Sequence, residues 1–264
     1  MTVDLQGARV LLTGATGGLG HAIARALNAK GATLTLTGRR VDVLEPLAKE
    51  LGARSIAADL SSMASIGAVL EEAGDVDVLI ANAALPGTGL LDDFTIEQID
   101  TNLAVNLRAP IVMTKAVLPQ MLARGTGHVV YIGSVSGITA SPGSSMYNAA
   151  KFGLRGFSNA LRQDLHGSGV GVSIVMPSFV RDAGMAVEGG LIEALPPGVR
   201  TVTPEQVAKG VIRAIRRNKG QVVVAPRELR IGATIGSVMP ELGGAVQRLS
   251  GAAEISAGHK GAKS

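Results

Sequence analysis

The amino-acid sequence predicts an α/β fold, a doubly wound parallel sheet of about seven strands with helices on both faces. Short apolar runs, rich in β-branched and aliphatic residues, are each bounded by Gly, Pro, Asp or Asn. The stretches between most of these runs are long enough for a crossover helix, which makes neighbouring strands parallel. Nearly continuous apolar runs also suit strands that are covered on both faces.

The expected strands follow one another along the chain, and helical patterns separate most of them. They span residues 8–14, 32–38, 53–59, 76–82, 127–133, 171–177 and 220–226. No linker and no internal repeat interrupts the series. We therefore expect one domain over residues 1–226, followed over residues 227–264 by a helical extension with a disordered end.

Composition excludes several classes of protein. Of the 264 residues, 46% are hydrophobic and 17% are charged, which excludes a disordered chain. No Cys is present, so disulfides, thiolate metal sites and a cysteine nucleophile are excluded, and we expect no metal site. The net charge is +4, but the basic residues are scattered and aromatic residues are few, so we expect no nucleic-acid partner.

The amino-terminal segment shows no signal-peptide pattern, and no apolar run is long enough for a transmembrane helix. We expect a cytoplasmic protein. The tail after Pro226 repeats apolar residues at helical spacing, and Pro240 interrupts the pattern. A helix packed on the core or on another subunit is the favoured interpretation, and a membrane-surface helix is the alternative. The repeating residues are Ile231, Ile235, Val238, Leu242, Val246 and Leu249.

One long segment, residues 178–200, does not fit the alternation of strands and helices. It is apolar and Gly-rich, and loops of this length are usually lids or binding loops. The following helix has a clear start, with Thr203 as N-cap, Pro204 at the first position and Gln206 completing a capping box. The loop's apolar residues suggest an apolar pocket, with packing on the core as an equal alternative; they are Met185, Val187, Leu191, Ile192 and Leu195.

A Gly-rich turn between the first strand and the first helix predicts a phosphate site. Its spacing is T-G-x-x-x-G-x-G, and it aims backbone N–H groups and the helix dipole at one point. We expect Gly14 to allow the sharp exit from the strand, Gly18 to let a pyrophosphate approach the backbone, and Gly20 to let the helix pack closely.

The second strand ends in Gly38, Arg39 and Arg40. In dinucleotide folds an acidic residue at this position holds the ribose 2′-hydroxyl, whereas Arg accepts a 2′-phosphate. No carboxylate is present here, so NADP is favoured over NAD as cofactor, and two arginines exposed to solvent are the alternative interpretation.

Several motifs together resemble the short-chain dehydrogenase/reductase family over roughly residues 5–225. "TGATGGLG" at 13–20 is similar to its glycine motif and "NAA" at 82–84 to its N-A-G element, while a set of four polar residues follows the order of its catalytic tetrad. The resemblance implies a Rossmann-like fold, an NAD(P)-dependent oxidoreductase and a homodimer or homotetramer. The tetrad is Asn106, Ser134, Tyr147 and Lys151. The cofactor-binding residues that it implies are Gly14, Thr16, Gly18, Leu19, Gly20, Arg39, Arg40, Asp59, Leu60, Asn82, Ala83, Tyr147, Lys151, Pro177 and Val180.

Tyr147 and Lys151 lie four residues apart, so a helix places both on one face. The resemblance implies that Tyr147 is the acid/base. A free phenol has a pKa of about 10, and we expect the ammonium of Lys151 to lower it. Ser134, at the end of the fifth strand, would orient a substrate carbonyl and stabilise charge on its oxygen.

Asn106 lies within a predicted long helix, four residues before Pro110. Because proline has no N–H, the carbonyl of Asn106 loses its usual partner, and we expect a kink. The resemblance implies a proton relay from water through Asn106 and Lys151 to Tyr147. Three positions depart from the family pattern: Ser178 and Ala84 replace Gly, and Asp182 replaces Thr.

The function that these residues favour is interconversion of a ketone and a secondary alcohol with NADP(H), on an apolar small molecule such as a lipid, steroid or acyl ketone. An NADP(H)-binding sensor with little catalysis is the alternative. Epimerisation or dehydration on the same fold is less favoured, since no further acid/base pair is evident.

Overall fold

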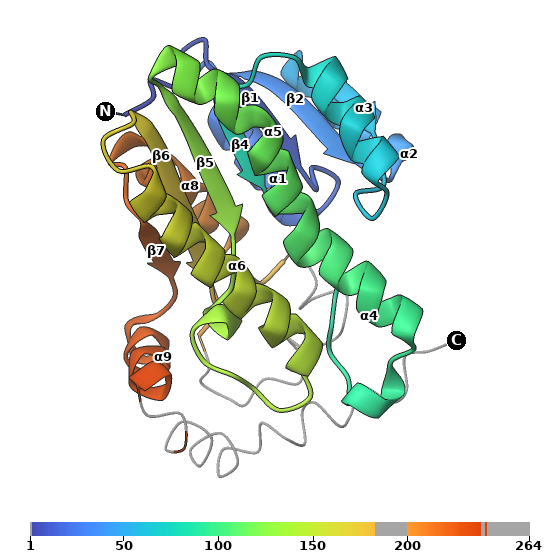
Figure 1. Cartoon of the computed structure of the whole chain (residues 1–264), viewed down its shortest axis with the longest axis vertical. Coiled ribbons are helices and arrows are strands. Elements are labelled where there is room, and N and C mark those ends of the chain that lie inside the picture. The colour runs from blue at the N-terminus through green and yellow to red at the C-terminus, as the bar shows by residue number, and fades with distance from the viewer. Residues whose placement is uncertain (1, 183–199, 239–240, 242–264) are drawn as a thin grey trace.

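A computed structural model describes residues 2–182, 200–238 and 241. Seven parallel strands form one sheet in the order β3-β2-β1-β4-β5-β6-β7, which confirms the predicted fold class (Figure 1). Each strand overlaps one of the runs expected from the sequence. The strands are β1 (Arg9–Thr13), β2 (Thr33–Gly38), β3 (Arg54–Ala57), β4 (Val78–Ala81), β5 (Gly127–Ile132), β6 (Val170–Pro177) and β7 (Gln221–Val224).

Helices connect the strands and cover both faces of the sheet (Figure 1). The α-helices are α1 (Gly18–Asn28), α2 (Val41–Leu51), α3 (Met63–Ala73), α4 (Ile96–Leu103), α5 (Ala109–Arg124), α6 (Ser145–Asp164), α8 (Pro204–Arg216) and α9 (Arg227–Val238). Two short 3-10 turns, η1 (Leu91–Asp93) and η3 (Val135–Gly137), and one π-helical segment, η2 (Ala104–Arg108), complete the described elements.

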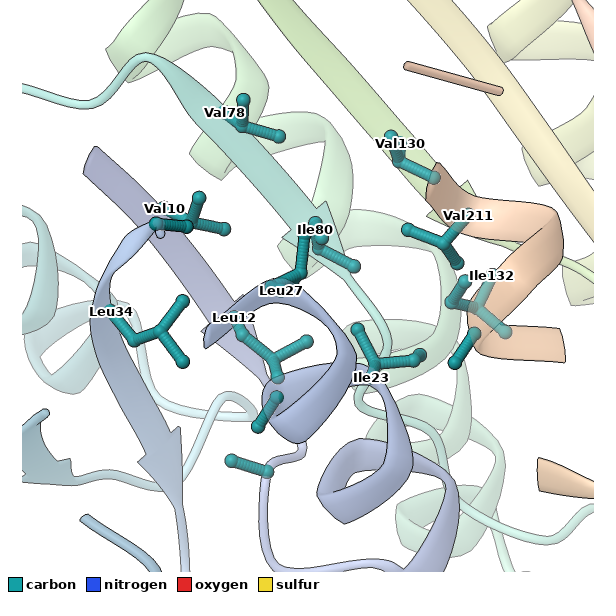
Figure 2. Close-up of a cluster of buried hydrophobic side chains, with 14 of the residues drawn as sticks. Val10, Leu12, Ile23, Leu27, Leu34, Val78, Ile80, Val130, Ile132 and Val211 are labelled. Atoms are coloured by element: carbon teal, nitrogen blue, oxygen red, sulfur yellow. The ribbon is translucent and has the colours of Figure 1, made fainter. Parts of the chain in front are cut away.

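Two apolar cores lie on opposite faces of the sheet, because side chains alternate along each strand. Figure 2 shows the core beneath α1 and α8, where Ile23 and Leu27 of α1 pack on Leu12 of β1. The intervening Leu11 faces the second core, which α3, α5 and α6 cover. Both faces of the strands are therefore apolar, as the continuous runs in the sequence predict.

The strand order reverses next to β1, which has β2 on one side and β4 on the other. The chain runs outward from β1 to β3 and then returns to β4, so the loops that follow β1 and β4 diverge. In open α/β sheets this switch point opens a crevice at the carboxyl ends of the strands.

At the opposite, amino-terminal edge of the sheet, polar side chains pair with one another. Asp77 accepts hydrogen bonds from Arg9 at its backbone N (2.9 Å), Nε (2.9 Å) and Nη2 (2.8 Å), and Arg124 lies 3.3 Å away. The bond from Arg9 is the main reason why the pKa of Asp77 is lowered. These charges join β1 to the start of β4.

A second polar group lies between β5 and β6. Nε2 of His128 and Oγ of Ser173 are 2.8 Å apart, and both side chains are almost fully buried. Burial lowers the pKa of His128 to about 3. Arg162 donates nearby to the carbonyl of Val172 and to Asn218, at 2.7 Å each.

The predicted start of α8 is confirmed. Oγ1 of Thr203 accepts from N of Gln206 at 3.2 Å, and N of Thr203 donates to Oε1 of Gln206 at 2.8 Å. These reciprocal bonds satisfy two N–H groups that a helix leaves without partners.

Only part of the apolar loop and of the tail belongs to the described residues. The apolar loop residues between 185 and 195 lie outside the described residues, as do the tail residues from 242 onward. In α9, Ile231 and Ile235 are 62% and 47% exposed, so these two do not pack on the core of this chain. Packing on another subunit, which the favoured interpretation also allowed, stays a prediction. Within the described residues, none of the helices combines the length and apolarity needed to cross a membrane. The division at residue 226 stays a prediction.

Candidate active site

A cavity of about 600 Å³ extends along the carboxyl ends of the strands. It is bordered by the segments that follow β1 to β6, and so it spans the switch point. Most of the residues predicted to bind a cofactor or to act in catalysis lie in its wall: Gly14, Thr16, Leu19, Gly20, Arg39, Arg40, Asp59, Leu60, Asn82, Ala83, Ser134, Tyr147, Lys151, Pro177 and Val180.

The Gly-rich turn forms one end of the cavity. Gly14 has φ +64°, and a Cβ there would lie 2.7 Å from Cα of Ala83. A Cβ on Gly20 would lie 2.3 Å from the carbonyl oxygen of Gly14, so the turn closes tightly on the start of α1. Gly17 is the N-cap of α1 and lines the cavity, whereas Gly18 is exposed and does not. Gly17 therefore joins Gly14 and Gly20 in the cavity wall.

Thr13 and Asn82 join the loops after β1 and β4. Oγ1 of Thr13 accepts from N of Asn82 and N of Ala83, both at 3.0 Å. Nδ2 of Asn82 donates to the carbonyls of Thr13 and Gly14, also at 3.0 Å. These bonds fix the Gly-rich turn against β4. The sequence interpretation did not assign Thr13 a role, although it begins the T-G motif.

Two exposed guanidinium groups and one carboxylate lie at the end of the cavity formed by β2 and β3. Arg40 donates to the carbonyl of Thr16 at 2.5 Å, which ties it to the Gly-rich turn. The carboxylate of Asp59 accepts from N of Ser61 at 2.9 Å. That bond is the main reason why the pKa of Asp59 is lowered, and the charge of Arg39 contributes less. This end of the cavity carries more positive than negative charge.

Tyr147, Lys151 and Ser134 meet at the other end of the cavity. Nζ of Lys151 lies 5.5 Å from the centre of the Tyr147 ring, so the two side chains share one face of α6. Nζ also donates to the carbonyl of Ile132 at 3.0 Å. Ser134 lies close enough to Tyr147 for hydrogen bonding to lower the pKa of the phenol, and Oγ of Ser134 accepts from N of Ser136 at 3.0 Å.

Burial is the main cause of the pKa shifts of Tyr147 and Lys151. It raises the pKa of Tyr147, and the hydrogen bond with Ser134 only partly opposes the rise. Burial also lowers the pKa of Lys151 to about 8. The net direction for Tyr147 is therefore opposite to the lowering that was expected from Lys151, because the loss of hydration outweighs the opposing effect of Ser134.

Asn106 lies in η2 rather than in a regular helix. Ala109 donates to the carbonyl of Ala104, five residues back, which is the π-helical pattern. The irregularity expected from Pro110 takes this form. Asn106 does not line the cavity; its Oδ1 accepts from N of Leu85 at 2.7 Å, and its Nδ2 donates to the carbonyl of Leu85 at 2.9 Å. Its place in a proton relay stays a prediction.

The departures from the family pattern occupy different surroundings. Ser178 lines the cavity, is 8% exposed, and its Oγ has no hydrogen-bond partner within the described part of the chain. Asp182 is exposed, has φ +63° and forms a 3.5 Å ion pair with Arg181. It is not part of the cavity wall. Ala84 lines the cavity near the end of β4.

The sequence interpretation missed one wall of the cavity, formed by residues 85–88, and the buried Asn102 that contacts it. The spacing of Asn102 to Asn106, one helical turn, was a usable signal for a shared polar face. No group of three or more His, Cys, Asp or Glu side chains able to hold a metal occurs among the described residues.

Comparisons with known proteins agree with this geometry. The family described as short chain dehydrogenase matches residues 8–189. Ketoacyl reductase HetN of Nostoc sp. is 35% identical over 229 residues, which cover 83% of this chain and 79% of that protein.

Two solved structures are similar in fold. A short-chain dehydrogenase from Sphingobium yanoikuyae in complex with NADPH has a TM-score of 0.77 at 28% identity, and the match covers 88% of this chain and 94% of that one. An actinorhodin polyketide ketoreductase variant with NADPH has a TM-score of 0.74 at 30% identity and covers 85% and 98%. The chain therefore belongs to the short-chain dehydrogenase/reductase family of NAD(P)-dependent oxidoreductases, which act on CH–OH groups.

Proposed function

We propose that this protein interconverts a ketone and a secondary alcohol with NADP(H), on an apolar acyl ketone. The observation that carries the proposal is the meeting of Tyr147, Ser134 and Lys151 at one end of a cavity whose other end is a Gly-rich turn. One end suits proton transfer to an oxygen atom, and the other suits a pyrophosphate.

The residues present fit NADP(H). Without a Cβ on Gly14 and Gly20, the turn packs closely against neighbouring backbone at the N-terminus of α1, which is where a pyrophosphate would bind. Arg39 and Arg40 border the cavity where a 2′-phosphate would lie, and Gly38 leaves no carboxylate to repel it. When bound, the cofactor supplies or accepts the hydride. NAD is the alternative cofactor.

The protein's own groups would handle the proton. In reduction, Oη of Tyr147 gives its proton to the ketone oxygen; in oxidation, it takes the proton of the alcohol. Because burial raises the pKa of Tyr147, the phenol is protonated at neutral pH, which suits its role as the acid in reduction. Oγ of Ser134 holds the same oxygen by a hydrogen bond. Nζ of Lys151 faces the Tyr147 ring and favours the phenolate once it forms.

Two observations support an acyl ketone. The names of the similar proteins include a ketoacyl reductase and a polyketide ketoreductase. In addition, much of the cavity wall around the reacting end is apolar: Leu85, Pro86, Val105, Ile132, Phe179 and Val180.

The test is a panel of hydrophobic ketones, including 3-ketoacyl thioesters, supplied with NADPH or NADH. We expect NADPH oxidation to be faster, and Arg39→Ala with Arg40→Ala to remove the preference by raising the KM for NADPH about tenfold or more. Arg216→Ala, an exposed arginine on α8, is the control and leaves the KM unchanged. A wild-type protein that prefers NADH contradicts the cofactor proposal. NADPH binding without turnover across the panel favours the sensor alternative.

A further inference from the structure

Residues 85–87, here called the strap, connect three parts of the site. N and O of Leu85 bond to the side chain of Asn106 in η2. The carbonyl of Pro86 accepts from Nδ2 of Asn102 in α4 at 2.9 Å. The carbonyl of Gly87 accepts from N of Tyr147 in α6 at 3.3 Å. All three strap residues also line the cavity.

Asn102 and Asn106 act on the strap as a pair. Nδ2 of Asn106 donates to Oδ1 of Asn102 at 3.0 Å, and the two residues are 1% and 3% exposed respectively. The amide of Asn102 thus uses its oxygen toward Asn106 and its nitrogen toward Pro86. Each half of this buried amide has a partner, so its orientation is fixed.

Gly87 lies between Asn102 and the tyrosine. A Cβ on Gly87 would lie 2.9 Å from Nδ2 of Asn102 and 3.0 Å from N of Tyr147. That N–H belongs to the first turn of α6, where a helix offers it no partner of its own. The strap carbonyl fills this need, and only one peptide separates Asn102 from the backbone of Tyr147.

We propose that Asn102 is a positioning residue that holds the strap against the start of α6 and thereby sets where Tyr147 meets Ser134 and the substrate. The inference rests on the proposed function of Tyr147 as acid/base. Asn102 touches neither of these side chains in the hydrogen bonds described; it acts through Pro86 and Gly87.

The main test is Asn102→Leu, which keeps a similar side-chain size but removes the donor to the Pro86 carbonyl and one of the two acceptors of Nδ2 of Asn106, whose bond to the carbonyl of Leu85 remains. We expect kcat to fall about ten- to a hundredfold, since small displacements of a reacting group have effects of this size. The Kd for NADPH, measured by its fluorescence, stays within about twofold, because the Gly-rich turn and the arginines are untouched.

A second readout separates positioning from plain stability. In alcohol oxidation, the rise of kcat with pH reports deprotonation of Tyr147. A tyrosine displaced from Ser134 loses the hydrogen bond that lowers its pKa, so the midpoint moves to higher pH. Lys151 is the charged group of the cavity wall at this end, whereas Arg39, Arg40 and Asp59 border the other end. The substitution changes none of these charges.

Two controls match the change. Thr101→Ala alters the exposed neighbouring residue of α4 and leaves kcat and the midpoint unchanged. Ser173→Ala removes a buried hydrogen-bonding group at the far edge of the sheet, so it lowers the melting temperature without moving the midpoint.

Gly87→Ala is the second variant that tests the proposal. Its Cβ pushes on both Asn102 and Tyr147, and we expect the same fall in kcat and the same shift in midpoint.

The outcomes are distinguishable. If wild type neither binds NADPH nor reduces any ketone, the proposed function is wrong. If wild type is active but Asn102→Leu lowers only the melting temperature, with kcat and midpoint unchanged, Asn102 is a structural residue and the inference is overturned. If Asn102→Leu does not fold, wild-type kinetics in Gly87→Ala overturn it equally.

Discussion

The two edges of the sheet use polar side chains in opposite ways. At the amino-terminal edge, Arg9 and Asp77 satisfy each other, and Nε2 of His128 is bonded to Ser173, although Nδ1 of the same ring has no partner within the described residues. At the carboxyl edge, the hydroxyl of Ser178 has no partner within the described residues, although it lies in the cavity wall. Polar groups that are paired within the protein stabilise the fold, whereas groups left beside a cavity are available to a ligand.

This contrast predicts that substitutions at the two edges affect different quantities. Changes at the amino-terminal edge should alter the free energy of unfolding and leave turnover intact. Changes at the carboxyl edge should lower turnover and leave the free energy of unfolding nearly unchanged.

The largest expected effect compares the two tyrosines. Tyr147→Phe removes the proton donor and should lower kcat about a thousandfold, with little change in melting temperature. Tyr131→Phe removes a buried hydroxyl that lies 2.7 Å from Oγ1 of Thr114, in the core beneath α5. It should lower the melting temperature and keep kcat near wild type. Enzyme assays and thermal melts on both variants measure the contrast, and comparable kcat values would break it.

A smaller effect is expected at the Arg9–Asp77 pair. Asp77→Ala removes the acceptor of three donors of Arg9 and an ion-pair partner of Arg124, and should cost about 2 kcal/mol of unfolding free energy. Glu50→Ala, in the ion pair with Arg25, should cost clearly less, because solvent screens this exposed pair. Urea unfolding gives both values. Equal losses of unfolding free energy in the two variants would show that the Arg9–Asp77 pair behaves as an ordinary surface ion pair. A reduced kcat in Asp77→Ala would show that this pair also affects turnover.

At neutral pH the smallest effect is expected from His128, since its contribution appears only in acid. His128 has a folded pKa of about 3, below its ordinary value of 6.5, so between these values the unfolded chain binds a proton that the folded protein does not. Stability is therefore unaffected above pH 6.5 and falls by about 1.4 kcal/mol per pH unit below it. His128→Gln should unfold with a shallower dependence between pH 6 and pH 4. If the unfolding free energy of both proteins changes equally with pH, His128 does not cause the loss of stability in acid.

Sequence patterns predicted the sheet well because each strand carries its own signal. The runs around Leu11 and Leu79 are apolar on both faces, and Gly or Asn ends them. The Gly-rich turn and the spacing of Tyr147 to Lys151 are likewise local, so the cavity's two ends follow from short motifs.

The features that sequence patterns did not predict depend on contacts between segments that are far apart in the sequence. No local pattern links the strap to Asn102, because their hydrogen bond joins residues sixteen apart across a turn of irregular backbone. The pKa of Tyr147 also requires its burial, which the sequence does not reveal. The lining of the turn is a further example: Gly17 lines the cavity and Gly18 does not, and the predicted role of Gly18 stays a prediction.

The π-helical turn at 104–108 has a consequence for how this protein can diversify. A π turn accommodates one residue more than an α turn, so it uncouples the rotation of α4 from that of α5. A change in the length or tilt of α4 would therefore move Asn102 and the cavity wall that it contacts, while α5 keeps its packing on the sheet. Substitutions in α4 should alter the cavity wall with less effect on the core than substitutions in α5.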